Sequence, residues 1–113
     1  MARIAIVGVA LIGLLVLVPE LGGDRLTAQS REALVAEGRR LFNEKGCYGC
    51  HTVGAAGTPI GPDLRRTAAR YPEADLARWL RDPAAQEPTR HMPNLQLSEA
   101  DASAIAAFVA SLR

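Results

Sequence analysis

The sequence is poor in the residues and patterns that many protein classes depend on. Only two cysteines, two histidines and two methionines occur among its 113 residues. No stretch alternates apolar and polar residues over a convincing length, and no internal repeat is present, so β-sheets and solenoid repeats are not predicted. Positive charge is not in excess, because residues 31–113 hold eleven Lys or Arg against ten Asp or Glu. Nucleic acid is therefore not expected as a partner.

Long apolar runs are also scarce, and the one clear example lies at residues 4–18. It consists of fifteen apolar or glycine positions between Arg3 and Pro19. An export signal has an apolar core of about 7 to 15 residues, whereas a membrane-spanning helix has about 20. No A-x-A-like cleavage site follows the run, so we favour a membrane anchor over residues 1–21, with signal cleavage and a soluble periplasmic product as the alternative. In both cases the rest of the chain lies on the periplasmic or extracytoplasmic side.

The remaining sequence divides into a polar linker at residues 22–29 and one small domain at residues 30–113. We expect an all-α domain with three main helices and long loops. A domain of this size buries little core, and loops of such length are unusual within it. Small domains of this kind need an additional stabilising element besides their hydrophobic core.

Helical spacing of apolar residues predicts the three helices. The first begins at Ser30, which can cap it, and stops at Gly46. The last begins at Ser98, followed by Asp101 in a capping-box-like pattern, and has an apolar stripe that ends at Leu112. Glycine and proline interrupt the two loops. The predicted helices and loops alternate over residues 30–46, 53–64, 72–82, 83–97 and 98–112.

Both cysteines stand in the pentad CYGCH, which contains Cys47, Cys50 and His51. A disulfide would close too short a loop to add much stability, and a thioredoxin-like redox pair would need a βαβ pattern that the sequence lacks. A structural zinc site needs four ligands, and the pentad with His91 has a spacing that fits no ordinary finger. In an exported chain, the motif favours covalent attachment of a c-type haem, with two thioether bonds and the imidazole as iron ligand.

The chain resembles the small, monohaem class I cytochromes c over residues 31–113. GCYGCH stands in front, GPDL in the middle, and an MP pair precedes the C-terminal amphipathic helix. The resemblance implies a cytochrome c fold, in which three main helices and long loops wrap around one covalently bound haem c with its iron. It also implies that the carbonyl of Pro62 orients the imidazole of His51.

The same resemblance implies roles for several aromatic residues and one glycine. Tyr71 and Trp79 would hydrogen-bond a haem propionate or pack against the ring edge, with an ordinary core position as the alternative. Gly38, Phe42 and Phe108 would form the crossing of the first and last helices, where glycine permits close approach.

The sixth ligand of the iron decides the function. Iron with an open axial site can bind oxygen, peroxide or nitric oxide, whereas iron with two side-chain ligands mainly changes its redox state. Met1 is on the other side of the membrane segment, so Met92 is the available methionine, and its M-P context resembles that of the family's thioether ligand. His91 is the competing ligand, and a gap-filling role in the core is the remaining alternative for Met92.

We therefore predict an electron carrier, not an enzyme, with His51 and Met92 as axial ligands. It would pass single electrons between respiratory or photosynthetic partners, such as a quinol-oxidising complex and a terminal oxidase, as a tethered shuttle or as a subunit of a membrane complex. No small-molecule substrate is expected. The alternatives are a haem peroxidase or gas-binding sensor with a displaceable sixth ligand, and a structural subunit in which the haem only stabilises the fold. A local positive patch is expected from three arginines: Arg65, Arg66 and Arg70.

Overall fold

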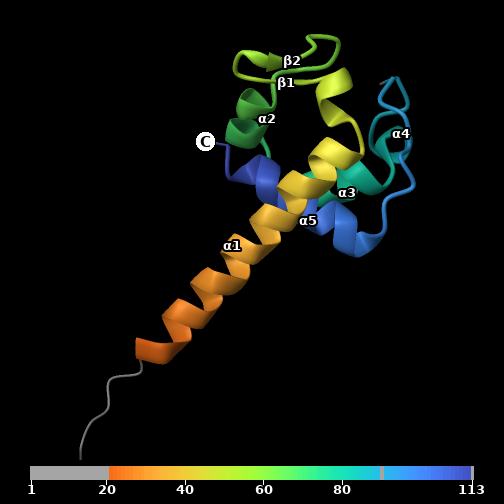
Figure 1. Ribbon diagram of the computed structural model, residues 1–113. Helices are drawn as coiled ribbons and strands as arrows, with labels where there is room; N and C mark the ends of the chain where they lie inside the picture. Colours follow the sequence, from red (N-terminus) through yellow and green to blue (C-terminus); the bar gives the residue numbers. More distant parts are fainter. Residues whose placement is uncertain (1–20, 90, 113) are drawn as a thin grey trace, which may run out of the picture.

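The computed structural model describes residues 21–89 and 91–112, and within these ranges the domain is mostly helical (Figure 1). The all-α prediction is confirmed. The predicted anchor or signal segment lies, apart from its last residue, outside the described residues. In chain order the elements are α1 (Leu21–Glu44), the 3-10 turn η1 (Cys47–Gly49), β1 (Thr52–Val53), β2 (Ala56–Gly57), α2 (Leu64–Arg70), α3 (Glu73–Arg81), α4 (Pro83–Gln86) and α5 (Glu99–Ala110).

The frame of the domain is the crossing of α1 and α5 (Figure 1). Gly38 permits the close approach, because a Cβ at this position would lie 1.9 Å from the carbonyl oxygen of Ala104. One turn further along α1, Phe42 packs edge-on against Phe108, with ring centroids 5.2 Å apart. The guanidinium carbon of Arg39 lies 5.5 Å from the centroid of the Phe108 ring. The predicted crossing of the first and last helices is therefore present, with glycine at the point of contact.

Helix α5 is buried on more sides than the single apolar stripe that we predicted. Ser98 caps it as expected, since its hydroxyl oxygen accepts a hydrogen bond from the N–H of Asp101 at 3.1 Å. Helices α1, α2 and α3 all contact α5, which leaves little of its middle facing solvent. Small side chains make this close packing possible. The buried residues are Ala102, Ala104, Ile105, Ala106, Ala107, Phe108 and Val109.

Helix α1 begins at Leu21 and continues through residues 22–29, which we predicted as a linker. Ser30, the predicted cap, lies inside the helix instead, where its hydroxyl donates to the carbonyl oxygens of Leu26 and Thr27 at 2.9 and 3.0 Å. Serine can satisfy its hydroxyl in this way within a helix, so a serine alone does not mark a helix start. The N-terminal half of α1 projects away from the other elements (Figure 1). Among the helices of the described ranges, none has the length and apolar character that crossing a membrane requires.

A short hairpin occupies the first part of the loop that we predicted at residues 53–64, and α2 begins at its last residue, whereas residues 58–63 are irregular as predicted. Thr52 pairs with Gly57, and Val53 pairs with Ala56, in antiparallel register. Helix α2 begins directly after Asp63, whose carboxylate accepts a hydrogen bond from the second backbone N–H of the helix and so acts as its cap. Two side chains one turn apart anchor α2 in the core: Leu64 and Ala68.

Helix α3 lies within the predicted range, and its Leu76 is buried in the core beside α5. Arg31 of α1 donates two hydrogen bonds to the carboxylate of Glu73 at 2.8 and 2.5 Å, which ties the start of α3 to α1. The segment 83–97 is mostly irregular, as predicted, except for the single turn α4. Asp82 caps this turn by accepting a hydrogen bond from the N–H of Ala85 at 3.2 Å.

Candidate functional site

The CYGCH pentad begins just after the C-terminal end of α1. Gly46 turns the chain with a φ of 75°, a left-handed conformation that glycine adopts without strain. The turn η1 then places Cys47 half-buried against the core, whereas Cys50 is exposed. Both thiols are free, so the disulfide alternative is not formed. Burial raises the pKa of the Cys47 thiol, which therefore stays protonated at neutral pH.

His51 is held through one of its two ring nitrogens. Its Nδ1 lies 2.9 Å from the carbonyl oxygen of Pro62, the contact that the family resemblance implied. Because a carbonyl oxygen can only accept, Nδ1 carries the proton and donates it, which leaves the lone pair of Nε2 for another group. The loop returns to the pentad through the Gly61 N–H, which donates to the carbonyl oxygen of Cys50 at 2.5 Å. A Cβ at Gly61 would lie 2.5 Å from Cε1 of the imidazole, so only glycine leaves the ring in this position.

Asp63 connects the hairpin to α2 immediately after Pro62 in the chain. Its Oδ1 accepts a hydrogen bond from the backbone N–H of Arg65 at 2.8 Å, and its Oδ2 accepts one from the hydroxyl of Thr52 at 3.1 Å. These hydrogen bonds, the one from Arg65 foremost, hold the pKa of Asp63 below its ordinary value. Thr52 follows His51 directly, so the Thr52–Asp63 hydrogen bond fixes both ends of the segment that carries the His51–Pro62 contact.

Met92 is half-buried and contacts Trp79 of α3. The indole Nε1–H donates a hydrogen bond to the sulfur of Met92 at 3.1 Å, and a thioether sulfur retains a second lone pair for another partner. The single N–H of Trp79 is engaged by Met92 in this structure. Both expected roles of Trp79, a hydrogen bond to a haem propionate and packing against the ring edge, stay predictions. His91, the competing ligand, is exposed.

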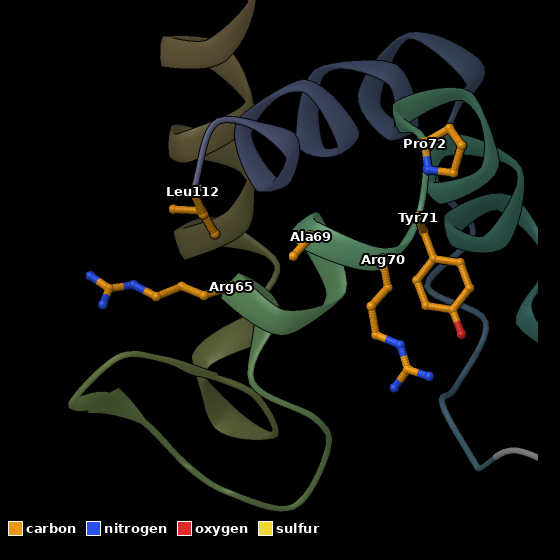
Figure 2. A pocket seen from close by; sticks show the side chains of 6 residues that line it. All are labelled: Arg65, Ala69, Arg70, Tyr71, Pro72 and Leu112. Atoms are coloured by element: carbon orange, nitrogen blue, oxygen red, sulfur yellow. The ribbon is translucent and has the colours of Figure 1, made fainter.

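Tyr71 lies at the C-terminal end of α2. Its side chain is 46% exposed. It lines an open pocket of about 920 Å³, shown in Figure 2, to which neither the pentad nor Met92 contributes. A contact between Tyr71 and a haem propionate therefore stays a prediction. The residues that line this pocket are Arg65, Ala69, Arg70, Tyr71, Pro72 and Leu112.

The donor groups fit a covalently bound haem better than a zinc ion. Two free thiols stand one short turn apart, and the imidazole that follows has an unused Nε2, which together are what c-type attachment requires. Gly61 keeps the space beside the imidazole free of side-chain atoms. Within the described part of the chain, no three His, Cys, Asp or Glu side chains gather into a metal site. The four ligands of a structural zinc site are thus not brought together there.

Sequence reasoning missed two residues that shape the site. For Asp63 a signal was present, because an aspartate before Leu64 and Ala68, two apolar residues one turn apart, is typical of a capped helix. Gly61 could not be distinguished from the other glycines of its loop. Its importance depends on the contact with the His51 ring, which no local pattern encodes.

The sequence is similar to known proteins over most of its length. A protein-family model described as "Cytochrome c" matches residues 35–113. The chain is also 37% identical over 91 residues to the protein named cytochrome c oxidase subunit 2 of Alkalihalophilus pseudofirmus. That match covers 73% of this chain and 27% of the relative, so the chain spans about a quarter of the relative's length. No solved structure matches the chain.

Proposed function

The chain belongs to the cytochrome c family, and from this premise we propose that it is a one-electron carrier with a single haem c bound through Cys47 and Cys50. Family membership itself indicates haem-based electron transfer; the number of haems, the axial ligands and the partners are our proposal. The observation that carries it is the state of His51. Its Nδ1–H donates a hydrogen bond to the Pro62 carbonyl oxygen, and the lone pair of its Nε2 is therefore available to an iron ion. The two cysteine thiols of the same pentad are free.

His51 and Met92 are the two axial ligands in this proposal. The Nδ1–H bond to the Pro62 carbonyl fixes the ring orientation and makes Nε2 a better donor. The hydrogen bond from Trp79 holds the Met92 sulfur in place and withdraws electron density from it. A weakly donating thioether favours ferrous iron and so raises the reduction potential. Trp79 is thus a positioning residue for the sixth ligand.

The chain's own residues would perform the carrier function by holding their positions while the redox state changes. When bound, haem supplies an iron that alternates between the ferric and ferrous states. Pro62 keeps the His51 proton on Nδ1 in both states, and Trp79 keeps Met92 oriented. The Thr52–Asp63 hydrogen bond restrains the loop between His51 and Pro62. With these residues held in place, transfer would need little rearrangement, and His51 and Met92 together would leave no site on the iron for a substrate.

We further propose that residues 1–21 attach the protein to a membrane, with the haem domain on the periplasmic or extracytoplasmic face; a soluble periplasmic protein after signal cleavage is the alternative. A quinol-oxidising complex as donor and a terminal oxidase as acceptor suit this placement. The similarity to a cytochrome c oxidase subunit 2 supports a role beside or within such a complex. Membrane attachment would raise the effective concentration of carrier and partner for each other.

Replacement of Met92 tests the axial ligands. We expect Met92→Ala to abolish the weak long-wavelength ferric band that thioether ligation gives, and to let the ferrous protein bind carbon monoxide rapidly. His91→Ala is the matched control at the neighbouring position and should leave both properties unchanged. The reverse pattern would assign His91 as the ligand. Rapid carbon monoxide binding by the unsubstituted protein would contradict the carrier and favour a gas sensor or peroxidase.

A further inference from the structure

The segment that carries Met92 has few attachments to the rest of the fold. Among the described residues of the stretch 88–97, none forms a backbone–backbone hydrogen bond. The indole of Trp79 donates to the sulfur of Met92 at 3.1 Å. At the other end, Leu97 is 8% exposed and anchors the segment in the core, just before Ser98 caps α5. The residues between Met92 and Ser98 therefore decide how firmly the sulfur is held on this side.

Gln96 adopts a backbone conformation that is unfavourable for its residue type. Its φ is 54°, and no other non-glycine residue in the part of the chain that the structure describes has a positive φ. The left-handed conformation brings Cβ close to the following carbonyl oxygen, which costs free energy for every residue except glycine. The side chain of Gln96 is exposed, so its own burial does not offset this cost. Contacts elsewhere in the segment must therefore hold the conformation.

Asn94 makes the contact that holds Gln96. Its Oδ1 accepts a hydrogen bond from the backbone N–H of Gln96 at 2.8 Å. An asparagine side chain that bonds the backbone two residues further on closes a small turn of its own, without help from a helix or a sheet. The leucines on either side of Gln96 both pack against the core, Leu97 as a buried member and Leu95 at its edge. The turn at Asn94 thus joins Met92 to the two core anchors of its segment.

We propose that Asn94 is a positioning residue for the sixth axial ligand, because it holds Gln96 in the turn that fixes the Met92 segment; this rests on the proposed ligation by Met92. Only Pro93 separates Asn94 from Met92, and the fixed φ of proline limits how the chain between them can adjust. Without the hydrogen bond from the Gln96 N–H, Gln96 leaves the left-handed region more often. Met92 is then displaced for a larger fraction of the time.

The test measures how often Met92 is displaced in the full-length haem protein. Free imidazole is the probe, because it occupies the sixth position of ferric iron only while Met92 is displaced. Its binding rate, followed by stopped-flow absorbance, is therefore proportional to the displaced fraction. One net hydrogen bond changes such an equilibrium about fivefold. We expect Asn94→Ala to bind imidazole about fivefold faster than the unsubstituted protein, and to lose the weak long-wavelength ferric band at a lower temperature.

Three further variants separate positioning from a general loss of stability. Asn43→Ala removes another exposed asparagine, whose Nδ2 donates to the carbonyl oxygen of Arg39 at 2.8 Å, and should change the imidazole rate by less than about twofold. Asn94→Asp keeps an acceptor oxygen and should retain the rate of the unsubstituted protein. Gln96→Gly in the Asn94→Ala protein should restore slow binding to within about twofold, because glycine adopts a positive φ without strain.

Three results would overturn the positioning role alone, in a protein whose thioether band is present. The first is an equal imidazole rate in Asn94→Ala and Asn43→Ala, and the second is fast binding that persists after Gln96→Gly is added to Asn94→Ala. The third is unchanged hydrogen exchange at the Gln96 amide in Asn94→Ala, where we expect faster exchange. If the unsubstituted protein lacks the thioether band and binds imidazole rapidly, Met92 is not the ligand, and the positioning role is rejected together with the proposed ligation.

Discussion

The α1–α5 crossing and the segments that carry the predicted haem ligands differ in how they are held. At the crossing, Phe42, Ile105 and Phe108 are at most 3% exposed, and the two backbones touch at Gly38. The turn η1 contains no buried residue, and Met92 is only half-buried. The crossing is held by close packing, whereas the ligand segments are held largely by hydrogen bonds such as His51–Pro62 and Trp79–Met92, with Tyr48 packed edge-on against Phe42 of the core. Close packing and the candidate site are therefore concentrated in different parts of this small domain.

Loss of the attachment cysteines should have the largest effect, because it removes what orders the ligand segments. We expect Cys47→Ala with Cys50→Ala to give a haemless, poorly folded product. Circular dichroism and amide hydrogen exchange would report low helix content and little protection. A well-folded apo domain would contradict the idea that folding is coupled to the cofactor, and would show that the α1–α5 crossing suffices alone.

Overpacking of the crossing should come second. Gly38→Ala places a methyl group 1.9 Å from the carbonyl oxygen of Ala104, so α1 and α5 must separate. We expect the free energy of unfolding to fall by about 3 kcal/mol, measured by denaturant titration. Gly23→Ala on the same helix is the matched control, since its Cβ would meet nothing within 4 Å. It should be neutral or stabilising by up to about 1 kcal/mol from helix propensity, and equal effects of the two variants would refute the packing argument.

The corresponding change in the ligand segments is Gly61→Ala, whose Cβ would lie 2.5 Å from Cε1 of His51. The imidazole must shift, and the hydrogen bond to Pro62 must lengthen. We expect a loss of about 2 kcal/mol in stability, a typical cost of overpacking, together with an altered ferric spectrum and midpoint potential. Gly49 lies between the two cysteines, and a Cβ there would meet nothing within 4 Å. Gly49→Ala should therefore leave the stability, the ferric spectrum and the midpoint potential unchanged. An unaltered spectrum in Gly61→Ala would show that the ring position is not set by this contact.

The smallest expected effect is the contribution of Asp63 to the pH dependence of the protein's stability. Hydrogen bonds from the Arg65 N–H and the Thr52 hydroxyl lower the pKa of Asp63 in the folded protein. This stabilisation is complete above the ordinary aspartate pKa of about 4, and it is lost as the pH falls below that value through the lowered folded pKa. Asp63→Asn keeps a good helix cap and removes the titration. Thermal melts between about pH 2 and 6 should show a shallower acid decline for the variant, and parallel curves would contradict this role.

Sequence patterns predicted the helices that build the core and missed the short elements beside the site. Helices α3 and α5 follow from apolar spacing and clear caps, as at Ser98. The two-residue strands of the hairpin are too short for any alternation to be visible. The start of α1 was misplaced, because Ser30 bonds back to the preceding turn instead of capping. Burial around α5 was underestimated, since alanine does not reveal how closely neighbouring helices approach.

At the site, the sequence predicted the chemical groups but only part of their surroundings. The family resemblance carried by the pentad and the GPDL segment implied the His51–Pro62 contact, which the structure contains. The Trp79–Met92 hydrogen bond was not foreseen, because it joins α3 to a loop whose path depends on the whole fold. The contact of Gly61 with the imidazole has the same origin. Contacts between distant segments are what sequence spacing cannot encode.

Mass spectrometry of the native protein, followed by peptide mapping, tests whether one haem is attached through Cys47 and Cys50. We predict a mass that exceeds that of the chain by one haem, with the added mass on the peptide that contains Cys47, Cys50 and His51. The same spectrum defines the N-terminus of the mature protein. A mass equal to that of the polypeptide alone, or a haem that is released without cleavage of thioether bonds, would contradict it.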